Sequence, residues 1–450
     1  MGVTFEADNI VLLMDSYGED SKKLYTSFVM AGKKYPAFVI EDDGFLPEGV
    51  TSVFGYFLGK FEPSETVPGK PRYFNQITVP EFWEISANNT SGKVHELNKE
   101  RARIFYTEPK HKRLVKVVDW LDDNGVVRSS DHYNKYGALY ARTVFNAKGQ
   151  KVNKSYFSAD GREIVMENYV TRDIILNEGK QVRIFHTKRE FVAYVLEKAG
   201  YAQHRVFYNT LSTSFFVSEN LKENGKGDVL FWQEPINNEI PGNMLGILKG
   251  ISRRTAKVMV QRQDSYEKLL ALGAPAKIIH PLGFIYPFEK ENAGKPEALI
   301  CTNSDNIAEL ERIVTALPEV HFSIAALTEM SSKLMGMDKY SNVSLYPGVK
   351  MPVLDELFDR TDFYLDINHE SEIVSAVQQA FLHNHLIFAF RETLHNATYV
   401  AKEHIFGVEQ AEELIKAIKA AMGNTEHLKA GLEKQREAAM LETKETYLGI

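Results

Sequence analysis

The sequence predicts an α/β protein that has two lobes built on parallel sheets and an antiparallel β-meander inserted into the first lobe. Three observations predict this fold class. Candidate strands alternate with candidate helices over residues 1–60 and again over 181–240. Glycines recur every 12 residues between those two stretches, and a second series of strands and helices runs through 241–425. Alternation of strands with helices is typical of parallel sheets, whereas closely spaced turns are typical of antiparallel ones.

The first lobe begins with a strand, a helix and a second strand. "NIVLLMD" is predicted to be a buried strand, "EDSKKLYTSFVMAGKK" a helix that Gly32 ends, and "AFVIED" the next strand. The same alternation returns after the meander in "VRIFHT", "KREFVAYVLEKAG" and "DVLFWQEP". The turn after the first strand, "SYGEDSKK", contains no G-x-G-x-x-G, so a dinucleotide site is not predicted there.

The insertion, residues 61–180, contains a repeat of turns and strands. Gly125, Gly137, Gly149 and Gly161 lie 12 residues apart, each preceded by turn-forming residues. An aromatic residue follows each glycine after eight residues: Tyr133, Phe145, Phe157 and Tyr169. A strand of about 8–9 residues and a turn of about three fill this period, which predicts an up-and-down meander. Because the meander is expected to be an insertion, we predict that removing residues 61–177 leaves two folded lobes.

The second lobe, residues 241–425, contains seven candidate strands separated by helices. They are "KVMVQ", "AKIIHPL", "EALICT", "HFSIAAL", "NVSLYP", "DFYLDI" and "HLIFAF". "EIPGNM" (239–244) is interpreted as a hinge before this lobe, and residues 426–450 as a C-terminal helix. Two Rossmann-like lobes predict a cleft protein whose ligands lie at the carboxyl ends of the strands.

Composition excludes several classes of protein. The 450 residues are 44% hydrophobic, and a net charge of -7 argues against nucleic acid as a partner. Cys301 is the single cysteine, so we expect no internal disulfide and a reducing cytoplasm. "MGVTFEADNI" lacks a signal-peptide pattern, and no apolar run reaches the about 18–20 residues of a transmembrane helix. We therefore expect at most a peripheral contact with the inner face of the membrane. The histidines show no metal-ligand spacing, and no cofactor is predicted.

The segment from "NVSLYPGV" to "LIFAF" resembles the nucleotide-sugar half of two-lobed retaining glycosyltransferases, the GT-B fold. In those enzymes a helix carries E-x7-E; the first carboxylate lies near the donor sugar, and the second accepts hydrogen bonds from ribose hydroxyls. Here Gln379 replaces the second glutamate, and Ser371, between Glu370 and Glu372, lies at or near the first. The resemblance implies a degenerate donor site; the alternative is a helix with a structural role alone.

The phosphate-binding cations of that fold are also missing from their expected place. The strand "LICT" is followed by "NSDNIAELER", in which the nearest basic residue, Arg312, comes after a run of carboxylates. A departing diphosphate would therefore have no charge partner, and one lost electrostatic donor costs about 2.7–4 kcal/mol of transition-state stabilisation. No catalytic residue is assigned.

Longer motifs extend a resemblance over nearly the whole chain: "FWQEPINNEIPGNM", "YLDINH", "IAALTEMSSKL" and "VDWLDDNG…YNKYG…YFSADG". They resemble the Gtf-B type of non-catalytic stabilising subunit, from the GlcNAc transferase pair that O-glycosylates serine-rich repeat adhesins in Gram-positive bacteria. The resemblance implies a catalytic sister subunit that uses UDP-GlcNAc, with this chain binding the acceptor and stabilising its partner in a hetero-oligomer. It further implies that the inserted sheet helps form the complex and that the adhesin leaves by the accessory Sec route.

Acceptor-binding residues are predicted after two strands that end at the cleft. They are Trp232, Gln233 and Glu234 at the lobe junction, and Asn368, His369 and Glu370 after the strand that ends at Ile367. The alternatives are core packing for the tryptophan and loop capping for the histidine and glutamate.

The meander is predicted to bind the partner, because free edge strands pair with other chains through backbone hydrogen bonds. The four repeat aromatics, Tyr133, Phe145, Phe157 and Tyr169, would form the rims of that interface. The alternative is a sheet that only covers the lobes.

A basic stretch could contact anionic lipid or an acidic partner, or could be a solvated strand face. It comprises Lys99, Arg101, Arg103, Lys110, Lys112, Arg113 and Lys116. Two rivals to the leading function remain open: an active retaining glycosyltransferase with Glu370 or Glu372 near the sugar, and a self-contained carbohydrate- or peptide-binding module that forms homo-oligomers.

Overall fold

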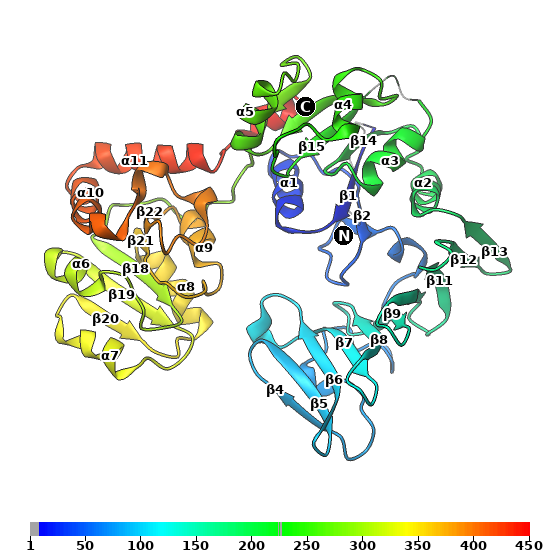
Figure 1. The fold of residues 1–450 in the computed structure, drawn as a ribbon, viewed down its shortest axis with the longest axis horizontal. Helices are drawn as coiled ribbons and strands as arrows, with labels where there is room; N and C mark the ends of the chain where they lie inside the picture. The colour runs from blue at the N-terminus through cyan, green and yellow to red at the C-terminus, as the bar shows by residue number, and fades with distance from the viewer. Residues whose placement is uncertain (1–8, 224, 226) are drawn as a thin grey trace. The chain divides into compact units, whose positions relative to one another are not determined.

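A computed structural model describes residues 9–223, 225 and 227–450. Most of the amino-terminal stretch in which we expected no signal peptide, residues 1–8, lies outside the described residues. The chain forms two compact units, 1–282 and 283–450, which are described separately (Figure 1).

The first unit contains a parallel sheet with seven described strands, in the order β17-β16-β15-β14-β1-β2-β3. Its strands and helices are β1 (Ile10–Ser16), α1 (Glu19–Met30), β2 (Ala37–Glu41), β3 (Val50–Ser52), α2 (Lys188–Lys198), β14 (Arg205–Tyr208), α3 (Thr213–Asn220), β15 (Asp228–Trp232), α4 (Gly242–Leu248), β16 (Thr255–Val260), α5 (Gln263–Ala271) and β17 (Ile279–Pro281). Helix α1 buries Leu24 and Phe28, as its periodicity predicts, and ends before Gly32, whose φ is +85°.

Two strands predicted for the second lobe belong instead to this sheet. β16 pairs in parallel with β15, and β17 pairs with β16, so the first lobe continues to Leu282 and not to residue 240. The "EIPGNM" stretch does not separate the lobes as a hinge, because β15 before it and β16 after it pair in the same sheet, and Pro241 precedes α4 between them. A strand–helix–strand pattern looks the same whether it extends one sheet or begins another, so the local sequence could not distinguish these cases.

The predicted meander is confirmed as an antiparallel sheet of ten described strands that follow chain order without exception (Figure 1). They are β4 (Glu84–Ala87), β5 (Ser91–Glu96), β6 (Lys99–Tyr106), β7 (Val115–Leu121), β8 (Val127–Tyr133), β9 (Leu139–Phe145), β10 (Lys151–Phe157), β11 (Glu163–Asn168), β12 (Ile174–Glu178) and β13 (Gln181–Phe185). All four repeat glycines have φ between +73° and +79°, which a glycine adopts without strain.

The two halves of this sheet bury opposite faces. On β5–β8, residues such as Ile104 and Val118 form a core with Ile77 from the preceding segment. On β9–β12, residues such as Tyr156 and Leu176 belong to the core of the first lobe. Register assigns the faces: Val118, Asp131 and Arg142 lie in one cross-strand row, whereas Ala141, Tyr156 and Val165 lie in the neighbouring row, which points the other way.

The inserted sheet is therefore not independent of the first lobe, contrary to the expectation for the deletion of 61–177. The Tyr156 ring stacks on Phe54 with centroids 4.4 Å apart and planes 3° apart, and Phe54 stacks on Phe191 of α2. The Lys188 ammonium lies 2.8 Å from the buried Glu167 carboxylate of β11. The first lobe would lose part of its core without the sheet.

The second unit contains a parallel sheet with six described strands, in the order β20-β19-β18-β21-β22-β23. Its strands and helices are β18 (Glu297–Thr302), α6 (Leu310–Ala316), β19 (His321–Ala326), α7 (Ser332–Met335), β20 (Val343–Tyr346), α8 (Met351–Arg360), β21 (Phe363–Asp366), α9 (Ala376–Leu382), β22 (Leu386–Phe390), β23 (Ile405–Phe406), α10 (Ala411–Gly423), α11 (Thr425–Ala438) and α12 (Lys444–Leu448). The predicted C-terminal helix is two helices, separated at Met440, whose φ is +53°.

Helix α11 is tied to the second sheet by one buried side chain. The Gln435 amide donates to His385 O at 2.8 Å and accepts from Ile387 N at 2.9 Å. Together with the apolar contacts of Leu428 and Leu432, these bonds make the helix part of this unit's core.

Candidate functional site

The carboxyl ends of β18 and β21 form the topological switch point of the second lobe, where open α/β sheets hold their ligands. Here the two loops that leave these strands bind each other. Ala308 N donates to Ile367 O at 2.8 Å, and His369 N donates to Asn306 O at 3.0 Å. Backbone hydrogen bonds therefore tie the two loops together across the switch point.

Asn368, predicted to bind the acceptor, instead joins these two loops through its side-chain hydrogen bonds. Its Oδ1 atom lies 2.9 Å from Thr302 Oγ1 and 3.3 Å from Ser304 Oγ, and its Nδ2 atom donates to Glu370 O at 3.0 Å. The side chain is 2% exposed, so it is not available to a ligand. His369 and Glu370 are exposed on the loop that it holds.

A charged pair closes the end of β21. His395 Nδ1 lies 2.5 Å from Asp366 Oδ1, and its Nε2 atom lies 2.6 Å from Glu370 O. The hydrogen bond to Asp366 raises the pKa of His395 to about 9, so both ring nitrogens carry protons at neutral pH. Glu372 accepts a hydrogen bond from Val377 N at 2.7 Å, and burial raises its pKa. These polar groups satisfy one another.

The predicted donor positions offer little to a nucleotide. Gln379 lies half-buried on α9, and Ser371 is exposed. Arg312 binds Glu412 at 2.8 Å and Glu309 at 3.3 Å. A small pocket of about 240 Å³ beside the β18 and β19 ends is lined by neutral side chains and by the carboxylates Asp305 and Glu329. Anionic phosphates would meet negative charge there.

The carboxyl edge of the first sheet carries a linked set of amides. Gln233 follows β15; its Oε1 atom accepts from Asn209 Nδ2 at 2.8 Å, and its Nε2 atom donates to Gln261 Oε1 at 2.9 Å. Asp15 at the end of β1 accepts from Thr210 Oγ1 at 2.8 Å and from Ser214 N at 2.9 Å. Polar side chains from four neighbouring parallel strands therefore meet at one edge.

Two buried polar atoms at this edge have no partner among the described residues: Asn209 Oδ1 and Trp232 Nε1. Their side chains are 4% and 3% exposed. Trp232 is a core residue, while Glu234 is exposed and its carbonyl accepts from Ser265 Oγ at 3.2 Å. A buried acceptor and a buried donor without partners are uncommon, and a ligand or ordered water would satisfy them.

The four repeat aromatics do not form a common rim. Tyr133 is buried, Phe145 and Phe157 are half-buried, and Tyr169 donates to Glu167 Oε2 at 3.1 Å. Highly exposed apolar residues of the sheet include Phe82 and Leu97 (88% and 89% exposed) near β4 and β5, and Val182 and Ile184 (64% and 57%) on the edge strand β13.

Most of the basic stretch is neutralised by neighbouring carboxylates. Arg101 binds Asp123 at 2.8 Å, and Arg103 binds Glu100 at 2.6 Å. Lys116 reaches Asp43 at 2.9 Å. The pairs favour a solvated charged surface over a lipid-binding patch.

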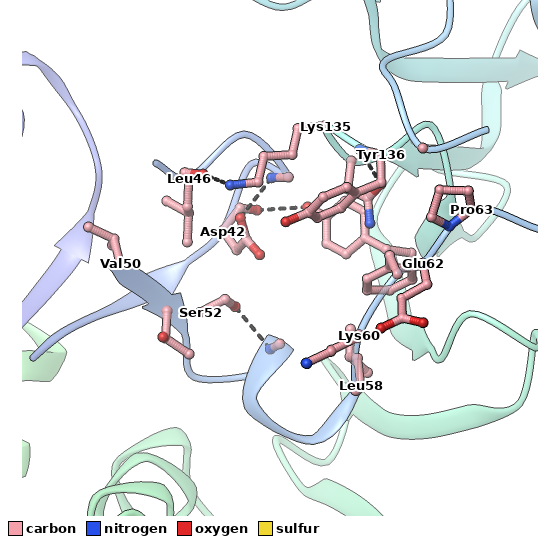
Figure 2. A pocket seen from close by; sticks show the side chains of 18 residues that line it. Asp42, Leu46, Val50, Ser52, Leu58, Lys60, Glu62, Pro63, Lys135 and Tyr136 are labelled. Carbon is pink, nitrogen blue, oxygen red and sulfur yellow. Dashed lines mark hydrogen bonds between the residues drawn. The ribbon is translucent and has the colours of Figure 1, made fainter. Parts of the chain in front are cut away.

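A larger pocket, of about 620 Å³, lies where the first lobe meets the turn between β8 and β9 (Figure 2). Asp42 follows β2, Ser52 ends β3, and Tyr136 comes from the turn. This pocket could not be predicted from the sequence, because its walls lie about ninety residues apart in the chain.

Four family models match consecutive parts of the chain: the GtfB N-terminal domain (11–57), the GtfB middle domain (83–186), the GtfB third domain (188–272) and the GftB/GlyA-F C-terminal domain (298–435). The UDP-N-acetylglucosamine–peptide N-acetylglucosaminyltransferase stabilizing protein GtfB of Streptococcus agalactiae is 42% identical over 443 residues, which are 98% of each chain. The chain belongs to the GtfB family of stabilising proteins. The relatives in this family are named as stabilizing proteins of a transferase. Membership therefore identifies this chain as an accessory, non-catalytic subunit.

Two solved structures place the fold. A chain in the crystal structure of a GtfA/B complex bound to UDP and GlcNAc is 38% identical, with a TM-score of 0.91 and 98% of both chains covered. The pneumococcal O-GlcNAc transferase GtfA, solved with UDP and GlcNAc, is 11% identical with a TM-score of 0.52 over 99% of this chain and 98% of its own. The family fold is therefore the two-lobed transferase fold. Among the described residues, no helix combines the length and apolar character needed to span a membrane.

Proposed function

We propose that this chain is the non-catalytic subunit of a peptide O-GlcNAc transferase, which binds and stabilises the catalytic subunit and presents the peptide acceptor. The observation that carries the proposal is full-length identity of 42% with a stabilising protein, combined with 38% identity to a chain of a GtfA/B complex. The switch point of the second lobe supports the non-catalytic half, because its loops bind each other, carboxylates line the pocket beside it, and Arg312 is paired with carboxylates.

The partner-binding surface in this proposal is the uncovered face of β11–β13. Val182 and Ile184 point to the same side of the edge strand, and Ile184 lies in a cross-strand row with Ile175 and Met166. The opposite side of these strands is buried against the first lobe. An exposed apolar edge strand promotes aggregation of an isolated chain, so a permanent partner over it is favoured.

A second pair of exposed apolar residues, Phe82 and Leu97, lies at the other end of the sheet. Phe82 precedes β4 and Leu97 follows β5, so both lie at the same end of this hairpin. Both have left-handed backbone, with φ of +67° and +52°, a conformation uncommon for such residues. Arg101 lies over the Trp83 ring and binds Asp123, which gives the pair a polar surround. Apolar anchors within a polar rim are typical of binding hot spots.

The acceptor-binding half of the proposal rests on the carboxyl edge of the first lobe. Amides of Asn209, Gln233 and Gln261 can exchange hydrogen bonds with a polar peptide, and the unpaired Asn209 Oδ1 atom would gain a partner. We extend the acceptor to the serine-rich adhesins that the family resemblance implies, modified at the inner face of the membrane before accessory Sec export.

Co-expression with the catalytic subunit tests the proposal. A Val182→Lys/Ile184→Lys double variant is expected to stay folded and to lose at least about tenfold in affinity for the partner, because lysine on an edge strand opposes pairing. Gln181→Lys, on the opposite face of the same strand, is the matched control. A double variant that copurifies with the partner and protects it from heat as the wild type does would contradict the proposed surface.

A further inference from the structure

The pocket between the first lobe and the inserted sheet is a built site. Its walls come from the segment that follows β2 and β3 and from the β8–β9 turn, and its volume of about 620 Å³ is in the range of small-ligand sites. Figure 2 shows Asp42, Ser52, Lys60, Glu62 and Tyr136 around one hollow.

Hydrogen bonds between the two walls hold this pocket in shape. Lys135 Nζ donates to Leu46 O at 2.6 Å, and Lys135 N donates to Gly44 O at 2.8 Å. The Tyr140 hydroxyl donates to Asp42 O at 3.1 Å. A Cβ atom on Gly44 would lie 2.6 Å from Tyr133 O, so the walls meet as closely as glycine permits. A pre-formed site loses less entropy when it binds.

The charges in the pocket balance. Asp42 and Glu62 contribute two carboxylates, and Lys60 and Lys135 contribute two ammonium groups. Asp42 accepts from Gly44 N at 2.7 Å and from the Ser52 hydroxyl, and burial raises the pKa of its carboxyl group. A phosphate or an anionic headgroup would find no net attraction here, whereas a neutral ligand with hydroxyl groups would find both acceptors and donors.

An aromatic surface borders these charges. Tyr136 is 39% exposed, and its ring stacks on Phe61 with centroids 6.3 Å apart and planes 13° apart. The negative face of an aromatic ring attracts the C–H groups of a flat neutral ring or side chain. A ring face beside a carboxylate suits a ligand with one apolar face and hydroxyl groups at its edge.

We propose that this pocket binds a hydroxyl-bearing part of the peptide acceptor: the Ser and Thr hydroxyls themselves, or a GlcNAc already attached to one of them. The inference rests on the proposed function, and both sources share the same chemistry, a neutral ligand that donates hydroxyl hydrogen bonds to Asp42 and packs on Tyr136. A site for attached GlcNAc would keep a partly modified acceptor on the complex between transfers.

The experiment uses the full chain in complex with its catalytic subunit and two probes: a synthetic Ser/Thr-rich peptide, and the same peptide with one O-GlcNAc. Fluorescence anisotropy gives Kd for wild type, Asp42→Asn and Tyr136→Ala. Each variant is expected to weaken binding of at least one probe by about tenfold or more. Asp43→Asn and Phe105→Ala, an adjacent carboxylate and an exposed ring outside the pocket, should leave both Kd values unchanged.

Weakening confined to the glycopeptide identifies the sugar as the ligand, and weakening of both probes identifies the peptide hydroxyls. Thermal unfolding of each variant complex verifies that it is folded, and Tyr136→Ala leaves the Asp42 hydrogen bonds in place. Folded variants that bind both probes as tightly as wild type would overturn the pocket assignment alone. A wild-type complex that binds neither probe would instead refute acceptor binding itself, and the pocket assignment with it.

Discussion

At the residue scale, polar side chains at the switch point of the second lobe form hydrogen bonds with one another and with the backbone. Asn368 joins the loops after β18 and β21, and His395 holds Asp366 and Glu370 O. Both sets lie where related folds hold a nucleotide. Their first effect should therefore be on stability and not on any reaction.

Asn368→Ala is expected to lower the free energy of unfolding by about 2–4 kcal/mol, because it removes the hydrogen bonds by which this buried amide joins Thr302, Ser304 and Glu370 O. Urea unfolding of the full chain measures it. His369→Ala, at the exposed neighbouring position, is the control and should change stability by less than about 0.5 kcal/mol. Equal stability of the two variants would show that the Asn368 side chain does not hold the loops together.

His395 predicts a pH dependence of stability. Its folded pKa of about 9 exceeds an unfolded value of about 6.5, so its contribution is complete below pH 6.5 and is lost as pH rises towards 9. His395→Gln should be about 2 kcal/mol less stable than wild type at pH 6, and the difference should narrow by pH 9.5. Urea unfolding at both pH values tests this; a difference that stays constant with pH would contradict the charged pair.

At the element scale, the inserted sheet is part of the first lobe's core. Replacing residues 61–177 with a flexible linker is expected to give an unfolded or insoluble chain, because Phe54 loses the Tyr156 ring and Lys188 loses the Glu167 carboxylate. Circular dichroism and urea unfolding measure the outcome. A soluble product with cooperative unfolding would show that the sheet is a separable domain after all.

Elements set by local demands were predictable from the sequence. The meander turns follow from glycine positions that require positive φ, and α1 follows from its buried face. The sequence did not predict that β16 and β17 belong to the first sheet, because this depends on which sheet has a free edge next to them in the folded chain. The "EIPGNM" stretch was misread since a proline before a helix and a proline in a hinge look alike in sequence.

The candidate site shows the same division. Polar residues after strand ends, such as Gln233 and Asn368, were located correctly at carboxyl edges. That Asn368 binds the chain itself could not be read, because Thr302 is 66 residues away. The exposure of Phe82 and Ile184 was also hidden, since an apolar residue in a strand pattern reads as core until the covering elements are placed.

At the scale of the whole molecule, the fold is the two-lobed transferase fold, and the loops at the switch point of the second lobe bind each other. The second lobe ties its switch point, the first lobe presents amides at its carboxyl edge, and the inserted sheet leaves one apolar face uncovered. Each feature supports the proposed role, in which the chain keeps a transferase architecture and uses it to hold other proteins.

Calorimetric titration of the purified chain with UDP tests the central claim most directly. We predict no saturable heat up to about 1 mM UDP for the chain alone, because carboxylates line the pocket beside the β18 and β19 ends and Arg312 is paired with carboxylates. Saturable binding of UDP with Kd below about 100 μM would contradict this claim if it is lost when Lys333 or Arg391 is replaced by alanine. Lys333 lies on α7, which follows β19, and Arg391 follows β22.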